Sequence, residues 1–193
     1  MKIALLLFFA LAAPAFAETI SSTYTSVDLK KCKQTQKPDG QVFEGSWNCK
    51  GIYGYDVYVE AADAREMVGF GQNGALTCAA TKTFNGFNSS GGRIEWRLKD
   101  GKPFAAIQRW TVSIDPENAE KHATWLVVNK LDKGFSCHMH YVAGAFPNAN
   151  AAARKAADAR ADKFNCEKGN PTFDSNSGPP PITLDDCSGR EKF

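Results

Sequence analysis

The sequence predicts an α+β domain, in which an antiparallel β-sheet of about five to seven strands carries one C-terminal helix packed on it, stapled by disulfides. Three observations indicate this class. Segments with alternating apolar side chains are separated by glycine-containing turns, which is typical of antiparallel strands. A single alanine-rich segment near the C-terminus has helical spacing. The chain also holds six cysteines, an even count typical of disulfide-bonded exported proteins.

Residues 1–17 have the pattern of a secretory signal peptide, with Lys2 before an apolar core and Ala15-Phe16-Ala17 at the cleavage site. The apolar core covers residues 3–13, which is shorter than the roughly 20 residues that a membrane-spanning helix needs. We therefore expect a mature chain that starts at Glu18, is periplasmic or secreted, and has no stable membrane anchor.

The rest of the chain is expected to form a single disulfide-stapled domain over residues 18–166, followed by an irregular tail at residues 167–193 that contains three consecutive prolines. The formal net charge of the 193 residues is +2, and it falls to +1 when Lys2 is removed with the leader. A charge so close to zero gives no electrostatic basis for binding nucleic acid or an anionic membrane.

The first half of the domain predicts short strands joined by turns. Residues 53–60 alternate apolar and polar side chains with period two, as a half-buried strand does. Residues 74–92 are rich in glycine, asparagine, serine and threonine, and we expect a long loop there. Three strands are predicted before this loop, at residues 23–29, 53–60 and 65–70.

Residues 93–114 predict a hairpin whose register depends on the length of its loop. A two-residue Asp100-Gly101 turn would place Trp96 opposite Ala105, and the apolar faces of the two strands would not match. A three-residue loop that starts at Lys99 places Trp96 opposite Phe104, and we prefer this register. The outer face of the hairpin then carries the charged side chains Arg93, Glu95, Arg97 and Arg109.

A second hairpin is expected from residues 124–131 and 135–142, again around a three-residue loop that ends with glycine. This register places Trp125 opposite Tyr141 and Val127 opposite Met139. Because both faces of the first strand are apolar, we predict that this pair lies in the centre of the sheet.

The final helix is predicted to start at Asn148 or Asn150, either of which can cap it. Its polar side chains fall largely outside one apolar stripe. The stripe consists of Ala153, Ala156, Ala157, Ala161 and Phe164. Because alanine buries little area, such a helix benefits from a covalent tether, and Cys166 lies at its end.

The cysteines are expected to form three structural disulfides, because no Cys-x-x-Cys spacing indicates a redox pair or a zinc ribbon. A turn at residues 37–40 brings the first two cysteines together, the helix tether gives the second bridge, and the third follows by elimination. The predicted pairs are Cys32–Cys49, Cys137–Cys166 and Cys78–Cys187.

The strongest candidates for functional residues are His138 and His140, which project from the same face if their strand is regular. Such a pair can bind zinc or copper, although we favour histidines that pack beneath the helix and form hydrogen bonds. Arg97 and Arg109 can hold an anionic ligand or pair with a neighbouring carboxylate. The carboxylates Asp56, Glu60 and Glu95 leave a hydrolase open as a further alternative.

Four short segments of the chain form a recognisable set. They are Ile94-Glu-Trp-Arg97, Pro103-Phe-Ala-Ala-Ile-Gln-Arg-Trp110, Ser136-Cys-His-Met-His-Tyr141 and Asn148-Ala-Asn-Ala-Ala-Ala-Arg154. Together these segments resemble small exported proteins of alphaproteobacteria for which no activity is established. The resemblance implies a periplasmic location and assigns no functional residue.

We therefore predict a non-enzymatic periplasmic or secreted binding module for an envelope component or another protein, without a cofactor. Two alternatives stay open: a metal-binding protein or metalloenzyme built on His138 and His140, and a hydrolase with unidentified carboxylates. The sequence names neither the ligand nor the oligomeric state.

Overall fold

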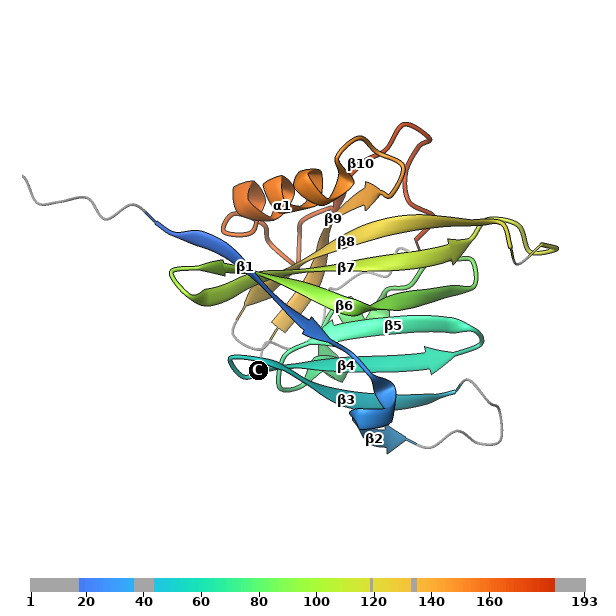
Figure 1. The fold of residues 1–193 in the computed structure, drawn as a ribbon, viewed down its shortest axis with the longest axis horizontal. Coiled ribbons are helices and arrows are strands. Elements are labelled where there is room, and N and C mark those ends of the chain that lie inside the picture. Colours follow the sequence, from blue (N-terminus) through green and yellow to red (C-terminus); the bar gives the residue numbers. More distant parts are fainter. Residues whose placement is uncertain (1–17, 37–43, 119, 133–134, 183–193) are drawn as a thin grey trace, which may run out of the picture.

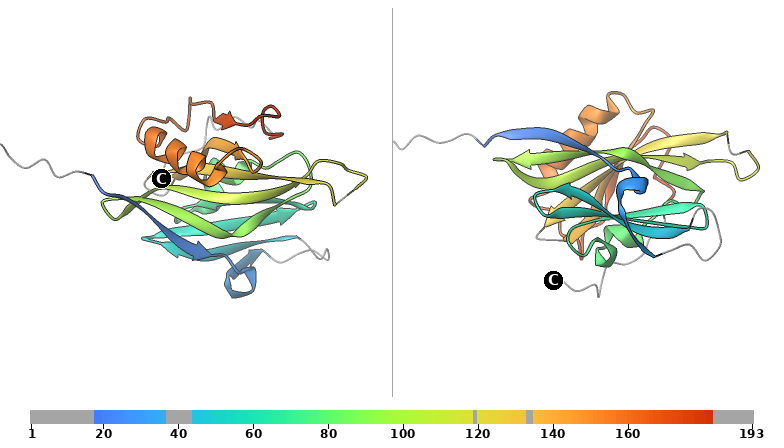
Figure 2. Two further views of the ribbon diagram at one scale, coloured as in Figure 1. Left: turned by 45° about the horizontal axis from the view of Figure 1, so that its top comes forward. Right: turned by 60° about the horizontal axis from the view of Figure 1, so that its bottom comes forward.

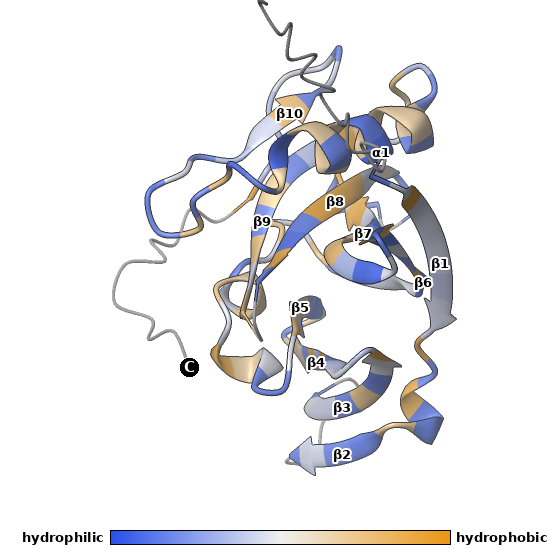
Figure 3. Ribbon diagram, turned by 90° about the vertical axis from the view of Figure 1, so that its left-hand side faces the viewer, coloured by the Kyte–Doolittle hydropathy of each residue, from blue (hydrophilic) through white to orange (hydrophobic). Residues whose placement is uncertain are grey.

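The computed structural model describes residues 18–36, 44–118, 120–132 and 135–182. Within these ranges the chain forms ten strands and one α-helix, arranged as a four-stranded sheet, a six-stranded sheet and a covering helix (Figures 1 and 3). The predicted α+β class is confirmed, with the strands divided between two sheets. The predicted signal peptide, the turn at residues 37–40 and Cys187 lie outside the described residues. No helix in the described ranges is long and apolar enough to span a membrane.

The six-stranded sheet has the order β1-β6-β7-β8-β9-β10 and is antiparallel except for the last pair, β9 and β10. Its strands are β1 (Ile20–Ser26), β6 (Asn88–Lys99), β7 (Lys102–Ser113), β8 (His122–Asp132), β9 (Phe135–Ala143) and β10 (Thr172–Asp174). The predicted central pair, β8 and β9, indeed has neighbours on both sides. The tail is less irregular than predicted, because β10 lies within it.

The four-stranded sheet is antiparallel and has the order β2-β3-β4-β5. Its strands are β2 (Lys33–Gln36), β3 (Gly45–Ile52), β4 (Tyr55–Ala62) and β5 (Arg65–Phe70). The bounds of β5 are the predicted ones. Three short 3-10 helices lie in the connections, at η1 (Leu29–Lys31), η2 (Gly74–Leu76) and η3 (Ala79–Thr81). The last two interrupt the predicted long loop of residues 74–92, and the final part of that prediction is wrong, because residues 88–92 belong to β6.

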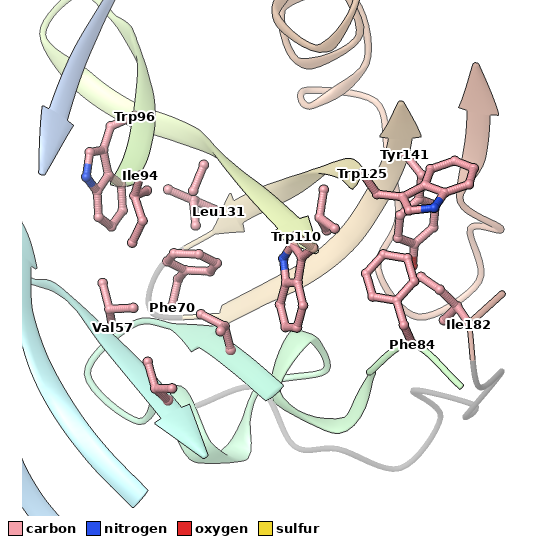
Figure 4. Packing of buried hydrophobic residues seen from close by; sticks show 14 of the residues in the cluster. Val57, Phe70, Phe84, Ile94, Trp96, Trp110, Trp125, Leu131, Tyr141 and Ile182 are labelled. Carbon is pink, nitrogen blue, oxygen red and sulfur yellow. The ribbon is translucent and has the colours of Figure 1, made fainter. Parts of the chain in front are cut away.

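The larger hydrophobic core fills the space between the two sheets (Figure 4). Trp96 and Trp110 of the six-stranded sheet are almost completely buried in it. Phe70 of β5 meets Trp96 edge to face, with ring centroids 5.7 Å apart. Burial of such aromatic side chains stabilises a fold strongly, because each removes a large apolar area from water.

A second core lies on the other face of the six-stranded sheet, beneath α1 (Ala149–Arg160) (Figure 2). The predicted alanine stripe is confirmed, since Ala153 and Ala157 are fully buried against this sheet. Asn148 is the residue that precedes the helix, but it has a left-handed backbone, with φ of 52°, and its side chain forms no capping bond.

Two of the predicted disulfides are confirmed. Cys32–Cys49 joins the end of η1 to β3, and Cys137–Cys166 joins β9 to the segment that follows α1. The third predicted bridge cannot be followed to Cys187, which lies outside the described residues. The described part of the chain contains no free cysteine.

The predicted three-residue loop of the first hairpin is wrong. Lys99 pairs with Lys102, so the turn is the two-residue Asp100-Gly101, and both of its residues have positive φ. A register shift then follows between Arg97 and Leu98. As a result Trp96 faces Ala106, and Phe104 packs toward α1 and away from the inter-sheet core. With this bulge the apolar faces of the two strands lie on the same side of the sheet. A two-residue turn without a bulge would place them on opposite sides.

The second hairpin contains the same kind of deviation, so its predicted register is also wrong. Trp125 pairs with Ala143 and Val127 pairs with Tyr141, while Asp132 pairs with Phe135. A shift between Val128 and Asn129 separates these two stretches and leaves Met139 as the extra residue of β9. A bulge of this kind changes which side chains share a face.

Candidate functional site

A cleft of about 390 Å³ lies between the first turns of α1 and the face of the six-stranded sheet. Arg93 of β6, Arg109 of β7 and Arg154 of α1 line it, and Ile107 and Leu126 contribute buried apolar side chains. We call this site the arginine cleft. Its volume lies within the range of about 300–1,000 Å³ that is typical of small-molecule sites.

A bulge in β6 shapes one wall of the cleft. Ser90 pairs with Trp110 and Ile94 with Gln108, so residues 91–93 lie opposite the single Arg109. A Cβ atom at Gly91 would lie 3.0 Å from the carbonyl oxygen of Arg109. The close approach of the two backbones therefore favours glycine here, and bulges of this kind often aim a side chain toward a site.

Arg93, the last residue of this bulge, lies over the ring of Tyr24 from β1. Its guanidinium carbon is 4.2 Å from the ring centroid, which is a cation–π contact. Among the described residues Arg93 has no ion-pair partner, so the contact orients its charge without neutralising it.

Arg109 donates a hydrogen bond from Nη2 to the side-chain oxygen of Asn150, at 3.0 Å. Asn150 lies in the first turn of α1, which contains no acidic residue. The partial positive charge of the helix N-terminus is therefore not compensated within that turn and adds to the charge of Arg109. Within the described ranges Arg109 also lacks a carboxylate partner.

Arg154 is the arginine of the cleft that is neutralised. It binds the carboxylate of Glu95 with two hydrogen bonds, from Nε at 2.6 Å and from Nη2 at 3.2 Å. Ser22 donates a further hydrogen bond to Glu95. Burial of Glu95 opposes ionisation, but these bonds and the charges of Arg154 and Arg97 outweigh it and lower the pKa of the carboxyl. Glu95 therefore stays charged at neutral pH.

The structure separates the two arginines that the sequence singled out. Arg109 lines the arginine cleft, whereas Arg97 is buried beneath α1, where it binds Asp158. The ion-pair partners of Arg97 and of Glu95 both come from α1, so neither side chain uses the cross-strand pairing expected within the hairpin. Sequence reasoning did not assign Arg93 or Arg154 to a site, because their convergence requires the docked helix.

The expectation that His138 and His140 share a face is wrong. His138 bonds through Nδ1 to the hydroxyl of Tyr141, at 2.8 Å, and Tyr141 belongs to the inter-sheet core. His140 pairs with Val128, which belongs to the core beneath α1. The bulge at Met139 separates the two rings, so they cannot bind one metal ion together. The described residues contain no group of three side chains that could hold a metal ion.

Each histidine ring instead forms hydrogen bonds with neighbouring side chains of the fold. Burial and the charge of Lys82 lower the pKa of His138 to about 3, so its ring is neutral at neutral pH. His140 bonds to the hydroxyl of Thr172 at 2.6 Å and to the carboxylate of Asp174 at 3.3 Å. These two bonds attach β10 to β9. Hydrogen-bonded histidines beneath the helix were favoured from the sequence, but His138 bonds to Tyr141 of the inter-sheet core, on the opposite face of the sheet from α1.

The three carboxylates considered for a hydrolase do not converge. Asp56 and Glu60 lie on β4 of the four-stranded sheet, whereas Glu95 faces α1 on the far side of the six-stranded sheet. Glu60 accepts a hydrogen bond from Tyr58 at 2.7 Å.

Comparisons with family models, curated proteins and solved structures return no match to this chain. The chemistry of the arginine cleft is therefore the basis for the functional proposal.

Proposed function

We propose that this protein is a non-enzymatic binding module that holds an organic anion in the arginine cleft. The observation that carries the proposal is the pair Arg93 and Arg109, two cationic side chains that line one cleft without an ion-pair partner in the described chain. An anionic ligand would offset part of this positive charge.

A carboxylate attached to an apolar body suits this cleft best. Guanidinium groups bind carboxylates through pairs of parallel hydrogen bonds. The buried side chains of Ile107 and Leu126 offer apolar contact next to these donors. Because such contacts exclude water, the charge-assisted bonds are stronger than they would be on an open surface.

The charged groups of the cleft favour binding over proton transfer. Arginine stays protonated throughout the physiological range, and the pKa of Glu95 is lowered. These groups keep their charge at neutral pH, so they provide a constant field for an anion.

Export to the periplasm or to the medium is part of the same proposal. It is supported by the two disulfides, since such bonds persist in oxidising compartments. The signal-peptide pattern of residues 1–17 and the resemblance to exported alphaproteobacterial proteins agree with it.

Isothermal titration of the chain from residue 18 onward with benzoate, acetate and phosphate tests the binding proposal. Benzoate should bind with one-to-one stoichiometry and more tightly than acetate, because it adds apolar contact. Arg109→Gln should weaken benzoate binding at least tenfold. The matched control is Arg65→Gln, which removes the same charge from β5, where Arg65 contacts Asp63. Equal affinities of the two variants, or no saturable binding by the unaltered protein, would contradict the proposal.

A further inference from the structure

We propose that the natural occupant of the arginine cleft belongs to an acidic polypeptide segment that pairs, in an extended conformation, with the edge of β1. This inference rests on the proposed function, because it identifies the organic anion as carboxylate side chains of a protein partner. It adds a second element, the backbone of β1, that a small anion does not need.

The first observation is the position of β1 in the sheet. β1 pairs with β6 along its whole length, and no strand of the described chain pairs with its other edge (Figure 3). The unpaired N–H and C=O groups of such an edge are a template for an added strand. Strand addition is a common mode of peptide recognition, in which the backbone supplies affinity and alternate side chains supply specificity.

The second observation is that the cationic surface continues from the cleft along α1. A second hollow is lined by Arg97, Arg154 and Lys155, and it shares Arg154 with the arginine cleft. Arg97 is paired with Asp158, and Arg154 is paired with Glu95. Among the described residues of this hollow, Lys155 is therefore the cationic side chain without an ion-pair partner. The two hollows together therefore present more cationic than acidic side chains, and an elongated anion can contact both.

The third observation concerns the side chains of β1 that face α1. Ser22 bonds to Glu95 and Arg97, and Tyr24 accepts a hydrogen bond from Arg154 at 3.2 Å, so both point to the α1 side. Side chains on neighbouring strands that lie opposite each other share a face. Every second residue of an added strand would therefore project toward the cationic surface. Alternating acidic residues are the pattern that fits.

Charge complementarity also selects between a foreign partner and a second copy of this chain. Pairing of β1 with β1 of a second copy about a two-fold axis would place two cationic surfaces on the same side of the joined sheet. Their repulsion disfavours this arrangement, and an acidic partner has the opposite effect. Ile20 and Tyr24, which are 41% and 42% exposed, would gain apolar contact from the added strand.

The test uses a fluorescent peptide with four glutamates alternating with three threonines, and fluorescence anisotropy as the readout. We expect it to bind at least tenfold more tightly than benzoate. The peptide with lysine in place of glutamate should not bind. Lys155→Gln should weaken peptide binding at least threefold and leave benzoate binding unchanged. Lys163→Gln, an exposed lysine beyond α1, is the matched control and should change neither.

Backbone pairing is tested with two further peptides, N-methylated either at the glutamates or at the threonines. In an added strand only one of these sets points its N–H groups at β1. One peptide should therefore lose at least tenfold in affinity while the other keeps it. Equal losses of affinity for the two N-methylated peptides would overturn the backbone pairing.

Tighter binding of an oligogalacturonate than of the peptide would assign the site to a glycan and overturn the inference. Benzoate binding with no gain for the peptide would refute the inference alone, whereas binding of neither would refute the proposed function as well.

Discussion

Asp158 of α1 accepts two hydrogen bonds from Arg97 of β6, one from Nε at 2.9 Å and one from Nη2 at 2.6 Å. The side chain of Arg97 is only 9% exposed and that of Asp158 is 28% exposed. The pair links the helix to the sheet next to Arg154, so it helps to hold the wall of the arginine cleft in place.

Asp158→Ala should therefore destabilise the fold. The change leaves a largely buried guanidinium without its carboxylate, and we expect the free energy of unfolding to fall by about 2–4 kcal/mol. Urea unfolding followed by tryptophan fluorescence measures this loss. Asp162→Ala is the control, because Asp162 forms an exposed pair with Lys99 and should matter little. Equal losses would show that the buried pair has no special role.

Gly101→Val should lower the free energy of unfolding by about 1–2 kcal/mol, because φ at this residue is 78° and a β-branched side chain resists that conformation. Gly101→Asn should have a much smaller effect, since asparagine tolerates the left-handed region. Thermal or urea unfolding of the two variants provides the comparison. Similar losses for both would mean that the turn is not strained by a side chain.

The buried ring of His138 should make the protein sensitive to acid. The unfolded chain takes up a proton on this residue below about pH 6.5, whereas the folded chain does so only near pH 3. Lowering the pH between these values therefore favours unfolding, by up to about 1.4 kcal/mol per pH unit.

His138→Gln should flatten this dependence and should also cost about 1–3 kcal/mol at pH 7, through the lost bond to Tyr141. The measurement is the free energy of unfolding in urea at several values between pH 7 and pH 4. His122→Gln serves as the control, because His122 is exposed. Parallel pH profiles for the His138 variant and the unaltered protein would contradict this account.

The disulfide Cys137–Cys166 should support both stability and binding. Replacing both cysteines with alanine should cost about 2–5 kcal/mol, as is typical for a native bridge of a small exported domain. It should also weaken benzoate binding, because the bridge anchors the end of the helix that carries Arg154. Removal of Cys32–Cys49 should destabilise the fold but leave benzoate affinity unchanged, since that bridge lies at the four-stranded sheet. Weaker benzoate binding after removal of Cys32–Cys49, with no change after removal of Cys137–Cys166, would contradict the assigned site.

The elements were more predictable from the sequence than their registers. The bounds of β5 and the buried stripe of α1 follow from local periodicity, because each depends only on which side chains must be buried. Local periodicity does not predict which side chains share a face of β7 or of β9. One extra residue, Phe104 in β7 and Met139 in β9, shifts the alternation of side chains along the strand. Neither residue is a glycine or a proline, so neither carries a local signal for a bulge.

The candidate site was predictable only in part, for a related reason. Arg109 could be identified as a possible anion-binding residue because it lies in a strand of alternating pattern. Arg93 enters the cleft through the bulge at residues 91–93, and Arg154 enters it through the docking of α1. Both depend on tertiary contacts between segments that are far apart in the chain, which single-sequence periodicity does not contain.

The most direct test of the central claim is a titration of the protein with benzoate, followed by NMR of the arginine side-chain Nε–H groups. The account predicts saturable shifts for Arg93 and Arg109 that give one common dissociation constant, with no saturable shift for Arg65. Linear shifts of similar size at all exposed arginines would show that the anion has no specific site in the cleft.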